Sequence, residues 1–331
     1  MDKLTRRDNI LLAYRHQKPH FIPSIDDSDI CYPSVLSEYP TQIGTYKDGW
    51  GVTWQLYDGQ PGPIQSKKDA VVLEEVTEWR DVVQFPHIET CDWEAGVAKD
   101  TATWDRENRI SNVVIVTGLW ERFYSLCGYE NGLCNILVDP EASFALLSEI
   151  ADHKIKYIQK LAEYYKPDKI QFHDDYGTER ALIMSVESWR DLIKPNLKKI
   201  VDACHELGIL YEHYSGGYIV PILEDFIELG IDAWSPVQNV NDPEALMERY
   251  NDKLTFVGAF NDRVYASAGS SAADKKASIT YTIHTFGATG SWIPMATVGE
   301  DDRQFINDAI HDYNAPKYAA LGLSGPLYTS C

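Results

Sequence analysis

The sequence is poor in positive charge and lacks the motifs that would identify a nucleotide-binding enzyme. Its 30 Lys and Arg residues stand against 50 Asp and Glu, which gives a formal net charge of -20. Such an acidic chain repels nucleic-acid phosphates and anionic lipids, so we expect neither as a partner. No GxGxxG or GxxxxGK[ST] motif occurs, which argues against a nucleotide-binding doubly wound sheet.

Long apolar runs and paired cysteines are also missing. No stretch approaches the roughly 20 apolar residues that cross a bilayer, and the charged N-terminus lacks the apolar core of a leader. We therefore expect a cytoplasmic protein. The six cysteines include no CxxC pair, and the spacing of Cys127 and Cys134 is not usual for zinc. Reduced, mostly buried thiols are the expectation.

A regular alternation of strands and helices fills the chain after Asn108. We predict strands at 112–120, 168–177, 209–213, 233–238, 254–260 and 292–297, and helices at 139–165, 185–208, 218–229, 243–250, 271–286 and from about 301. With a helix at 3–16 and a strand at 21–26, about eight strands are expected. This pattern predicts an α/β fold, a single (β/α)8 TIM barrel over residues 1–331.

Residues 41–108 interrupt this alternation. The segment is rich in Trp, Tyr, Gly and Pro, and it groups Asp48, Trp50 and Trp54 at one point. We interpret it as an irregular N-terminal capping segment over the mouth of the barrel. Its aromatic side chains either stack on an aromatic substrate or simply cover the mouth.

Polar residues gather where the predicted strands end, which is where (β/α)8 barrels carry their sites. These residues are Trp120, Glu121 and Arg122; His173, Asp174, Asp175 and Tyr176; Glu212, His213 and Ser215; Gln238; Asn261 and Asp262; and Thr297. From this set and the cap, we predict that substrate is bound by Tyr176, Trp120, Arg122, Ser215, Gln238, Asp262 and Trp50.

The catalytic candidates are His213, Asp174 and Asp175. His213 is a metal ligand, an acid/base or a hydrogen-bonded core histidine, and the Gly-Gly that follows favours function because backbone there can approach a ligand. Adjacent strand residues point oppositely, so we expect one aspartate to face the site and the other to cap a turn or pair with Arg180. His173 lies deeper in its strand and is expected to be structural.

Several blocks of the sequence resemble the uroporphyrinogen decarboxylase superfamily, over nearly the whole chain. They are RDNILLAYRHQKPHFIP, DGWGVTW, GLWERFYSLCGYENGL, HDDYGTE, and HYSGG followed by IELGIDAWSPVQ. The resemblance implies a (β/α)8 barrel with its site at the carboxyl ends of the strands. The superfamily comprises uroporphyrinogen decarboxylases and corrinoid-linked methyltransferases, so the resemblance alone leaves both activities open.

The methyltransferase branch is the more similar one. The decarboxylases hold a polycarboxylate with an arginine-bearing N-terminal motif, whereas this chain has Asp26, Asp27 and Asp29 there. The methyltransferases carry His-x-Cys-Gly at a strand tip, and His213 matches the histidine while Ser215 replaces the cysteine. The later cysteine of that branch is also missing near strand 292–297.

The resemblance implies zinc in the methyltransferase branch. Without the thiolates, we expect a harder ligand set of His213, Asp174 and Glu212, although Glu212 alternates with His213 and is expected to pack outward. We therefore hypothesise an O-demethylase methyltransferase that moves a methyl group from a small methoxyaromatic substrate to the Co(I) corrinoid of a partner protein. Zinc or an acid would polarise the leaving oxygen.

Two other functions remain open at this point. One is a metal-independent decarboxylase (lyase) of a small carboxylate, with His213 or Asp174 as proton donor. The other is a non-catalytic binding protein that keeps the barrel. The sequence does not identify the methyl donor or the corrinoid protein, and it leaves both a monomer and a homodimer open.

Overall fold

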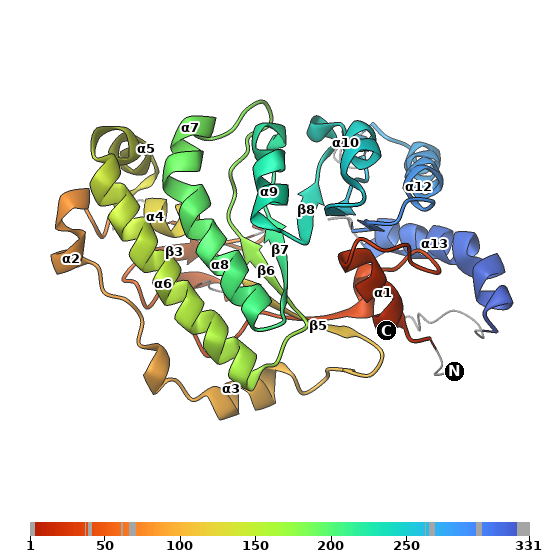
Figure 1. Ribbon diagram of the computed structural model, residues 1–331, viewed down its shortest axis with the longest axis horizontal. Helices are drawn as coiled ribbons and strands as arrows, with labels where there is room; N and C mark the ends of the chain where they lie inside the picture. Colours follow the sequence, from red (N-terminus) through yellow and green to blue (C-terminus); the bar gives the residue numbers. More distant parts are fainter. Residues whose placement is uncertain are drawn as a thin grey trace.

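The computed structural model describes residues 4–36, 38, 42–60, 62–65, 71–261, 263–264, 269–295 and 300–322. Seven parallel strands form one curled sheet in the order β1-β5-β6-β7-β8-β9-β10 (Figure 1). They are β1 (Ser28–Cys31), β5 (Ile110–Ile115), β6 (Lys169–His173), β7 (Leu210–Tyr214), β8 (Ala233–Val237), β9 (Thr255–Gly258) and β10 (Trp292–Ile293). This confirms the predicted barrel-like α/β class, with the curled sheet open between β1 and β10 in the described part of the chain.

Helices cover the outer face of this sheet and its open seam. They are α4 (Trp120–Cys127), α5 (Tyr129–Val138), α6 (Pro140–Tyr164), α7 (Val186–Ser188), η4 (Trp189–Ile193), α8 (Lys194–Glu206), η5 (Val220–Ile222), α9 (Leu223–Leu229), η6 (Asn239–Asn241), α10 (Pro243–Tyr250), α12 (Ala272–Phe286) and α13 (Glu300–Ala320). Figure 1 shows α6, α8 and α9 side by side over the strands. Within the described ranges, no helix is both long and apolar enough to span a membrane.

The helix starts follow local signals in the sequence. Proline occupies the first turn of α6, directly after Asp139. A capping box of Ser271 and Asp274 opens α12 by satisfying backbone N–H groups that have no partner within the helix. These signals explain why the predicted and observed helices coincide closely.

Helix α1 (Arg6–Tyr14) packs inside the curl of the sheet. A small core unites Ile10, Leu11, Ala13 and Tyr14 with Ile110, Ala233, Val257 and Ile293 of four different strands. Side chains of four strands meet one helix only on the concave side, so this face is the barrel interior. The opposite face, with Ile170, Phe172, Tyr211 and Trp234, joins the core that contains the helix residues Leu197 and Phe226.

The seam between β1 and β10 is filled by a loop and by α13. The strand predicted at 21–26 is wrong, because a capping box of Ser24 and Asp27 bends this segment into the short 3-10 helix η1 (Ile25–Asp27) before β1. The side chain of Asn314 on α13 pairs with both backbone groups of Ile22, at 2.9 Å each. An amide side chain thus satisfies groups that a neighbouring strand would otherwise pair.

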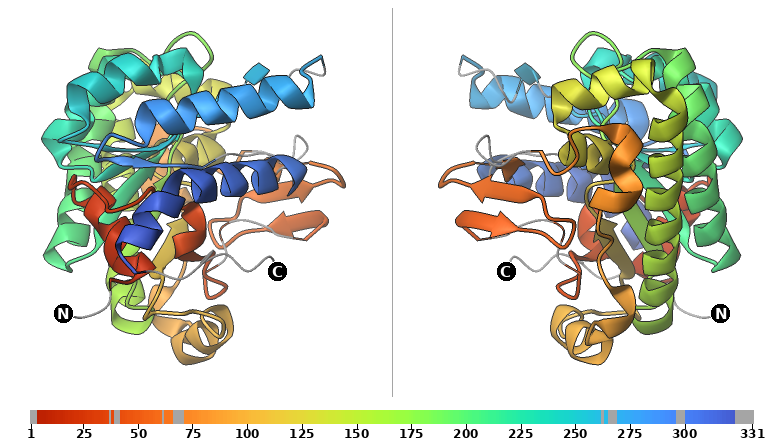
Figure 2. Two further views of the ribbon diagram at one scale, coloured as in Figure 1. Left: turned by 90° about the vertical axis from the view of Figure 1, so that its right-hand side faces the viewer. Right: turned by 90° about the vertical axis from the view of Figure 1, so that its left-hand side faces the viewer.

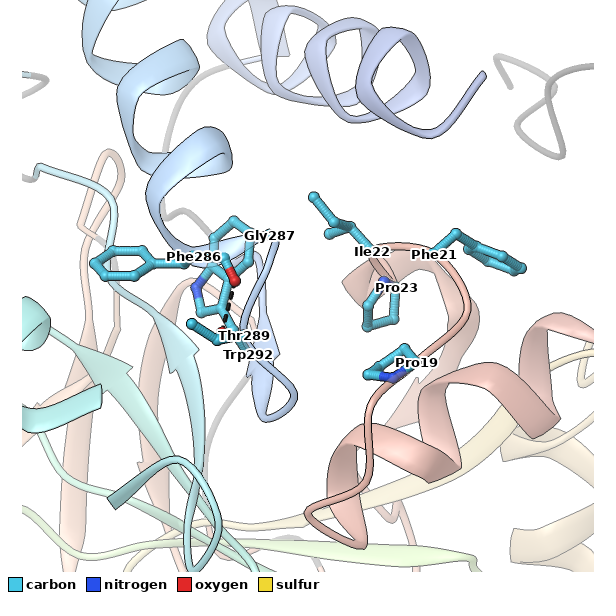
Figure 3. A pocket seen from close by; sticks show the side chains of 8 residues that line it. All are labelled: Pro19, Phe21, Ile22, Pro23, Phe286, Gly287, Thr289 and Trp292. Atoms are coloured by element: carbon cyan, nitrogen blue, oxygen red, sulfur yellow. Dashed lines mark hydrogen bonds between the residues drawn. The ribbon is translucent and has the colours of Figure 1, made fainter. Parts of the chain in front are cut away.

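A small pocket opens in the same seam (Figure 3). Pro19, Phe21, Ile22 and Pro23 line one side of it, and Phe286, Gly287, Thr289 and Trp292 line the other. Both segments lead into the amino-terminal ends of strands, β1 and β10. The pocket therefore lies at the end of the sheet opposite to the one where barrel enzymes carry their sites.

The predicted capping segment contains more regular structure than expected. Strands β2 (Gly44–Lys47), β3 (Thr53–Leu56) and β4 (Ile64–Gln65) form an antiparallel sheet, and η2 (Val76–Glu78), α2 (Trp79–Val82), η3 (Ile88–Thr90) and α3 (Trp93–Asp100) follow. Figure 2 shows this small sheet extending from the side of the body. The assignment of residues 1–331 to one domain with a cap at 41–108 stays a prediction.

Candidate functional site

The alternation of side chains along β6 and β7 divides the predicted site residues between two faces of the sheet. Gln171 lies beside Glu212, and His173 lies beside Tyr214, on the face that meets α1. His213 points the opposite way, into the layer between the sheet and the helices. Strand β7 thus ends close to the predicted position, but Glu212 faces the interior and His213 faces the helices, which is the opposite of the expectation.

His213 is a fully buried histidine of the outer layer. Its Nε2 lies 3.1 Å from the carbonyl oxygen of Asp174, and its Nδ1 lies 3.2 Å from the hydroxyl of Tyr211. Its ring stacks on Tyr176 and meets the edge of Phe226 in α9. Burial lowers the pKa of His213 to about 3, so the imidazole is neutral. Of the roles considered above, these contacts are those of a hydrogen-bonded core histidine.

Asp174 holds the start of α4 in place. Its carboxylate accepts hydrogen bonds from the backbone N–H groups of Leu119, Trp120 and Glu121, at 2.8–3.0 Å, and from the hydroxyl of Tyr176 at 2.7 Å. Burial raises the pKa of Asp174 to about 6, and these hydrogen bonds oppose the rise. A carboxylate with this many donors acts as an N-terminal helix cap.

Glu212 faces the interior, so the expectation that it packs outward is wrong. Its carboxylate pairs with Lys169 and accepts hydrogen bonds from Tyr14 at 2.9 Å, Gln171 at 2.5 Å and Ser235 at 2.6 Å. Burial by itself would raise the pKa of Glu212, but the charge of Lys169 outweighs it and the net shift is downward. Glu212 is therefore an ionised, fully hydrogen-bonded carboxylate inside the barrel.

The predicted zinc ligands do not fit a metal site. Asp174 and His213 lie in the outer layer and are occupied by hydrogen bonds, whereas Glu212 lies on the other face of the sheet and is paired with Lys169. Nowhere in the described ranges do three His, Cys, Asp or Glu side chains come together in a group able to hold a metal ion. We therefore assign no step of the reaction to zinc.

Ser215 joins the end of β7 to the loop after β6. Its hydroxyl accepts a hydrogen bond from the backbone N–H of Tyr176 at 2.9 Å, and its carbonyl oxygen accepts one from the indole of Trp234 at 2.9 Å. The side chain is fully buried. The hydroxyl that replaces the expected thiol thus aligns two neighbouring strand ends.

Asp175 and Gln238 fix the glycine pair that follows β7. The carboxylate of Asp175 accepts the backbone N–H of Gly216, and the amide oxygen of Gln238 accepts that of Gly217, both at 2.6 Å. Gly217 has φ of +74°, and a Cβ there would lie 2.4 Å from the backbone of Gly177, so only glycine fits. Asp175 and Gln238 are both half-buried, unlike Asp174 and Ser215.

Arg122 and Trp50 belong to a buried cluster of charges that anchors the β2–β3 hairpin. The guanidinium of Arg122 lies 2.7 Å from Asp48 and 3.5 Å from Glu38, and Lys154 also pairs with Glu38. The indole of Trp50 donates to Glu38 at 2.9 Å. Every partner in this cluster is buried, so the two residues predicted to bind substrate are used in packing.

The remaining predicted residues differ in their surroundings. β5 ends at Ile115, so Trp120 and Arg122 are in α4 and not at a strand end, which corrects the predicted boundary. Trp120 is fully buried and packs on Phe123. The hydroxyl of Tyr176 is committed to Asp174, as described above. Asp262 lies outside the described residues.

Two residues with functional potential were not selected from the sequence. Glu121 is half-buried in the first turn of α4. Burial and the nearby carboxylates of Asp174 and Asp175 raise its pKa well above the ordinary value. His173 is also half-buried, and its ring stacks on Tyr214 with 4.0 Å between the ring centres. The signal for His173 was present, because Lys169, Gln171 and His173 alternate with apolar residues in a strand that has a polar interior face.

The half-buried polar groups at the carboxyl ends of the strands therefore make up the candidate site. They are Glu121, His173, Asp175, Tyr214 and Gln238. A carboxyl group with a raised pKa beside a second carboxyl group can supply a proton. The stacked rings and the amide supply surfaces for a small planar ligand.

The fold resembles that of a known enzyme. A methyltransferase from Methanosarcina mazei is similar with a TM-score of 0.66 and 12% sequence identity, over 94% of this chain and 99% of that chain. A uronate isomerase from Bacillus halodurans matches with a TM-score of only 0.30 and 7% identity, over 68% of this chain and 62% of that one. The first likeness shows a shared fold, and the second is too weak to support an argument.

The sequence itself identifies the family. A search of the curated proteins finds no significant match. The family described as "Uroporphyrinogen decarboxylase (URO-D)" matches residues 62–288, which is more than half of the chain. This stretch includes the strands β5 to β9 and the site residues at their carboxyl ends. The chain therefore belongs to the uroporphyrinogen decarboxylase family.

Proposed function

We propose that this protein is a methyltransferase that removes the methyl group of a small methoxyaromatic compound and passes it to the Co(I) corrinoid of a partner protein. The resemblance to the methyltransferase branch of the superfamily implies this chemistry. The fold is also similar to that of a methyltransferase from Methanosarcina mazei. The observation that carries the proposal is the carboxyl group of Glu121, which lies at the carboxyl ends of the strands in surroundings that raise its pKa.

The surroundings of Glu121 favour its neutral form. Burial and the charges of Asp174 and Asp175 all raise its pKa, and only the backbone N–H of Asp175 and the charge of Arg122 oppose them. Asp174 is held in its place by the start of α4 and remains close to Glu121. A carboxyl group with a raised pKa holds its proton to higher pH than an ordinary carboxyl group, and this suits it to general acid catalysis.

The proton balances the demethylation. An aryl methyl ether loses its methyl group to the Co(I) nucleophile, the C–O bond breaks, and both bonding electrons remain on oxygen. Glu121 delivers its proton to that oxygen, so a phenol leaves instead of a phenolate. Asp175 and Gln238 hold the glycine pair that follows β7 in position by accepting its backbone N–H groups.

A highly anionic porphyrinogen suits this site less well. Three fully buried cations are each paired with a carboxylate, Arg122 with Asp48, Lys154 with Glu38 and Lys169 with Glu212. The half-buried groups Glu121 and Asp175 are acids. A polycarboxylate would thus meet carboxyl groups at the mouth, where the interaction is repulsive when they ionise.

The test uses the purified protein with free cob(I)alamin as methyl acceptor and a series of methoxybenzenes as donors. We expect protein-dependent formation of methylated cobalamin together with the matching phenol. The Glu121→Gln variant should lose at least tenfold in rate, because the amide keeps the shape of the side chain and has no acidic proton. Glu130→Gln, an exposed change on α5, should leave the rate unaltered.

Two outcomes would contradict the proposal. Release of CO2 from a small carboxylate, without methyl transfer from any donor, would favour the decarboxylase. Elemental analysis showing about one zinc per chain after metal-supplemented expression, lost together with activity in His213→Ala, would contradict the acid mechanism.

A further inference from the structure

We propose that His173 is a substrate-binding residue whose free ring nitrogen, Nδ1, accepts a hydrogen bond from a hydroxyl or amino group of the substrate. The inference rests on the proposed function only for the identity of the substrate. It follows from a chain of buried hydrogen bonds on the interior face, which runs from Lys169 through Glu212 and Gln171 to His173.

The second member of this hydrogen-bond chain, Glu212, is a carboxylate that only accepts hydrogen bonds. Glu212 is fully buried and paired with Lys169, and Tyr14 donates to the same carboxylate. An ionised carboxylate has no proton to donate. Whatever part of Gln171 faces Glu212 must therefore be its NH2 group, which lies 2.5 Å from the carboxylate and 3.2 Å from the hydroxyl of Ser235.

This orientation determines the tautomer of His173. With the NH2 group of Gln171 turned to Glu212, its amide oxygen faces His173 at 3.1 Å from Nε2. An amide oxygen accepts only, so Nε2 must carry the proton. Because burial keeps the ring neutral, with a pKa of about 4, the other nitrogen holds a lone pair.

Stacking fixes the direction in which that lone pair points. The ring of His173 is almost parallel to that of Tyr214, with an interplanar angle of 9°, which fixes its plane. The side chain is half-buried at the last residue of β6, two residues before Asp175. Within the described part of the chain, no hydrogen bond to Nδ1 is formed. A preset acceptor at the carboxyl end of the sheet distinguishes substrates that carry a polar hydrogen.

The substrate class follows from this acceptor. A methoxyaromatic with a neighbouring hydroxyl or amino group gives Nδ1 a donor, whereas a fully methylated analogue leaves the lone pair without a partner. Guaiacol (2-methoxyphenol) and veratrole (1,2-dimethoxybenzene) differ in this one group and form a matched pair of probes.

The first experiment measures the tautomer directly, by NMR of the full-length protein labelled with 15N-histidine at pH 7. His173 is identified by the signal that disappears in His173→Gln. We expect a protonated Nε2 and an unprotonated Nδ1, and in Gln171→Met both signals should move toward those of a free neutral imidazole. The control Thr255→Val removes another interior hydrogen bond, to Ala13, and should leave the signals of His173 unmoved.

The second experiment adds the two probes. Guaiacol should shift the Nδ1 signal of His173 and veratrole should not. A proton on Nδ1 in the native protein would overturn the assignment of the tautomer, and equal shifts with both probes, or none with guaiacol, would overturn the substrate class. If guaiacol shifts the signal but neither probe transfers a methyl group to cob(I)alamin, the binding role of His173 stands and the proposed reaction fails.

Discussion

The buried cluster around Glu38 gives a prediction about stability. Replacing Lys154 by Met removes one cation from a set in which two carboxylates, Glu38 and Asp48, balance Lys154 and Arg122. The side chains are 0–4% exposed, so water does not replace the lost partner. Breaking a buried pair from one side typically costs about 3–5 kcal/mol.

We expect the free energy of unfolding of Lys154→Met to fall by that amount, about 3–5 kcal/mol, in urea titrations followed by tryptophan fluorescence. The control is Lys198→Met, which breaks a half-exposed pair with Asp202 on α8 and should cost less than about 1 kcal/mol. The double variant Lys154→Met/Glu38→Gln should recover part of the loss, because it removes the carboxylate left without its cation.

The reasoning would be refuted if Lys154→Met cost no more than Lys198→Met. It would also be refuted if adding Glu38→Gln made the Lys154 variant still less stable, since the carboxylate would then not be the source of the cost. Either result would mean that the anchoring of the β2–β3 hairpin does not depend on the paired charges.

Three further predictions concern stability. Asp174→Asn should cost about 2–4 kcal/mol in urea unfolding, because an amide oxygen cannot accept the four hydrogen bonds that the carboxylate receives; a cost below about 1 kcal/mol would contradict its role as a cap. Gly118→Ala should lower the free energy of unfolding by about 2 kcal/mol or more, since its Cβ would lie 2.5 Å from the Cβ of Asp174. In the control Gly216→Ala the nearest atoms lie at 3.5 Å, so the free energy of unfolding should change by no more than about 0.5 kcal/mol. Equal losses in the two variants would contradict this prediction. Despite burial, Lys154 and Arg122 lower the pKa of Glu38 to about 2 from 4.5. The ionised carboxylate of Glu38 therefore stabilises the fold by about 3 kcal/mol above pH 4.5, and this stabilisation is lost as the pH falls toward 2. An acid titration in which Glu38→Gln loses as much stability as the native protein would contradict this prediction.

Most of the fold could be predicted because its signals are local. The Asp-Pro start of α6 and the capping box at Ser271 mark helix ends in the sequence, and the alternation with apolar strands indicates the parallel sheet. The strand expected at 21–26 was wrong because Ser24 and Asp27 satisfy each other's backbone groups, and this favours a turn of 3-10 helix over extended structure.

The site was harder to predict because the two faces of a strand exchange with a shift of one residue. The end of strand β7 was predicted correctly, but His213 was expected to face the barrel interior and Glu212 to face outward. In the structure Glu212 faces the interior and His213 faces the helices. The sequence did not reveal that the interior of the barrel is polar. This interior is formed by Glu212 and Lys169 together with Tyr14 of α1, which is far from both in the sequence. No pattern within β7 alone reveals that contact.

The buried cluster that joins the cap to α4 was also not predictable from local patterns. Trp50 and Arg122 were expected at a substrate because polar and aromatic side chains near a barrel mouth often have that role. Their partners, Glu38 and Lys154, come from separate segments, and only the folded chain shows that all four are buried together.

The pH dependence of methyl transfer to cob(I)alamin tests the central claim, that Glu121 is the proton donor. Because burial and the charges of Asp174 and Asp175 raise the pKa of Glu121, the rate should be highest at pH values below that raised pKa and fall as the pH rises through it. In Glu121→Gln the rate should be low and should not show this fall. A native profile without the fall, or the same fall in the variant, would contradict the claim.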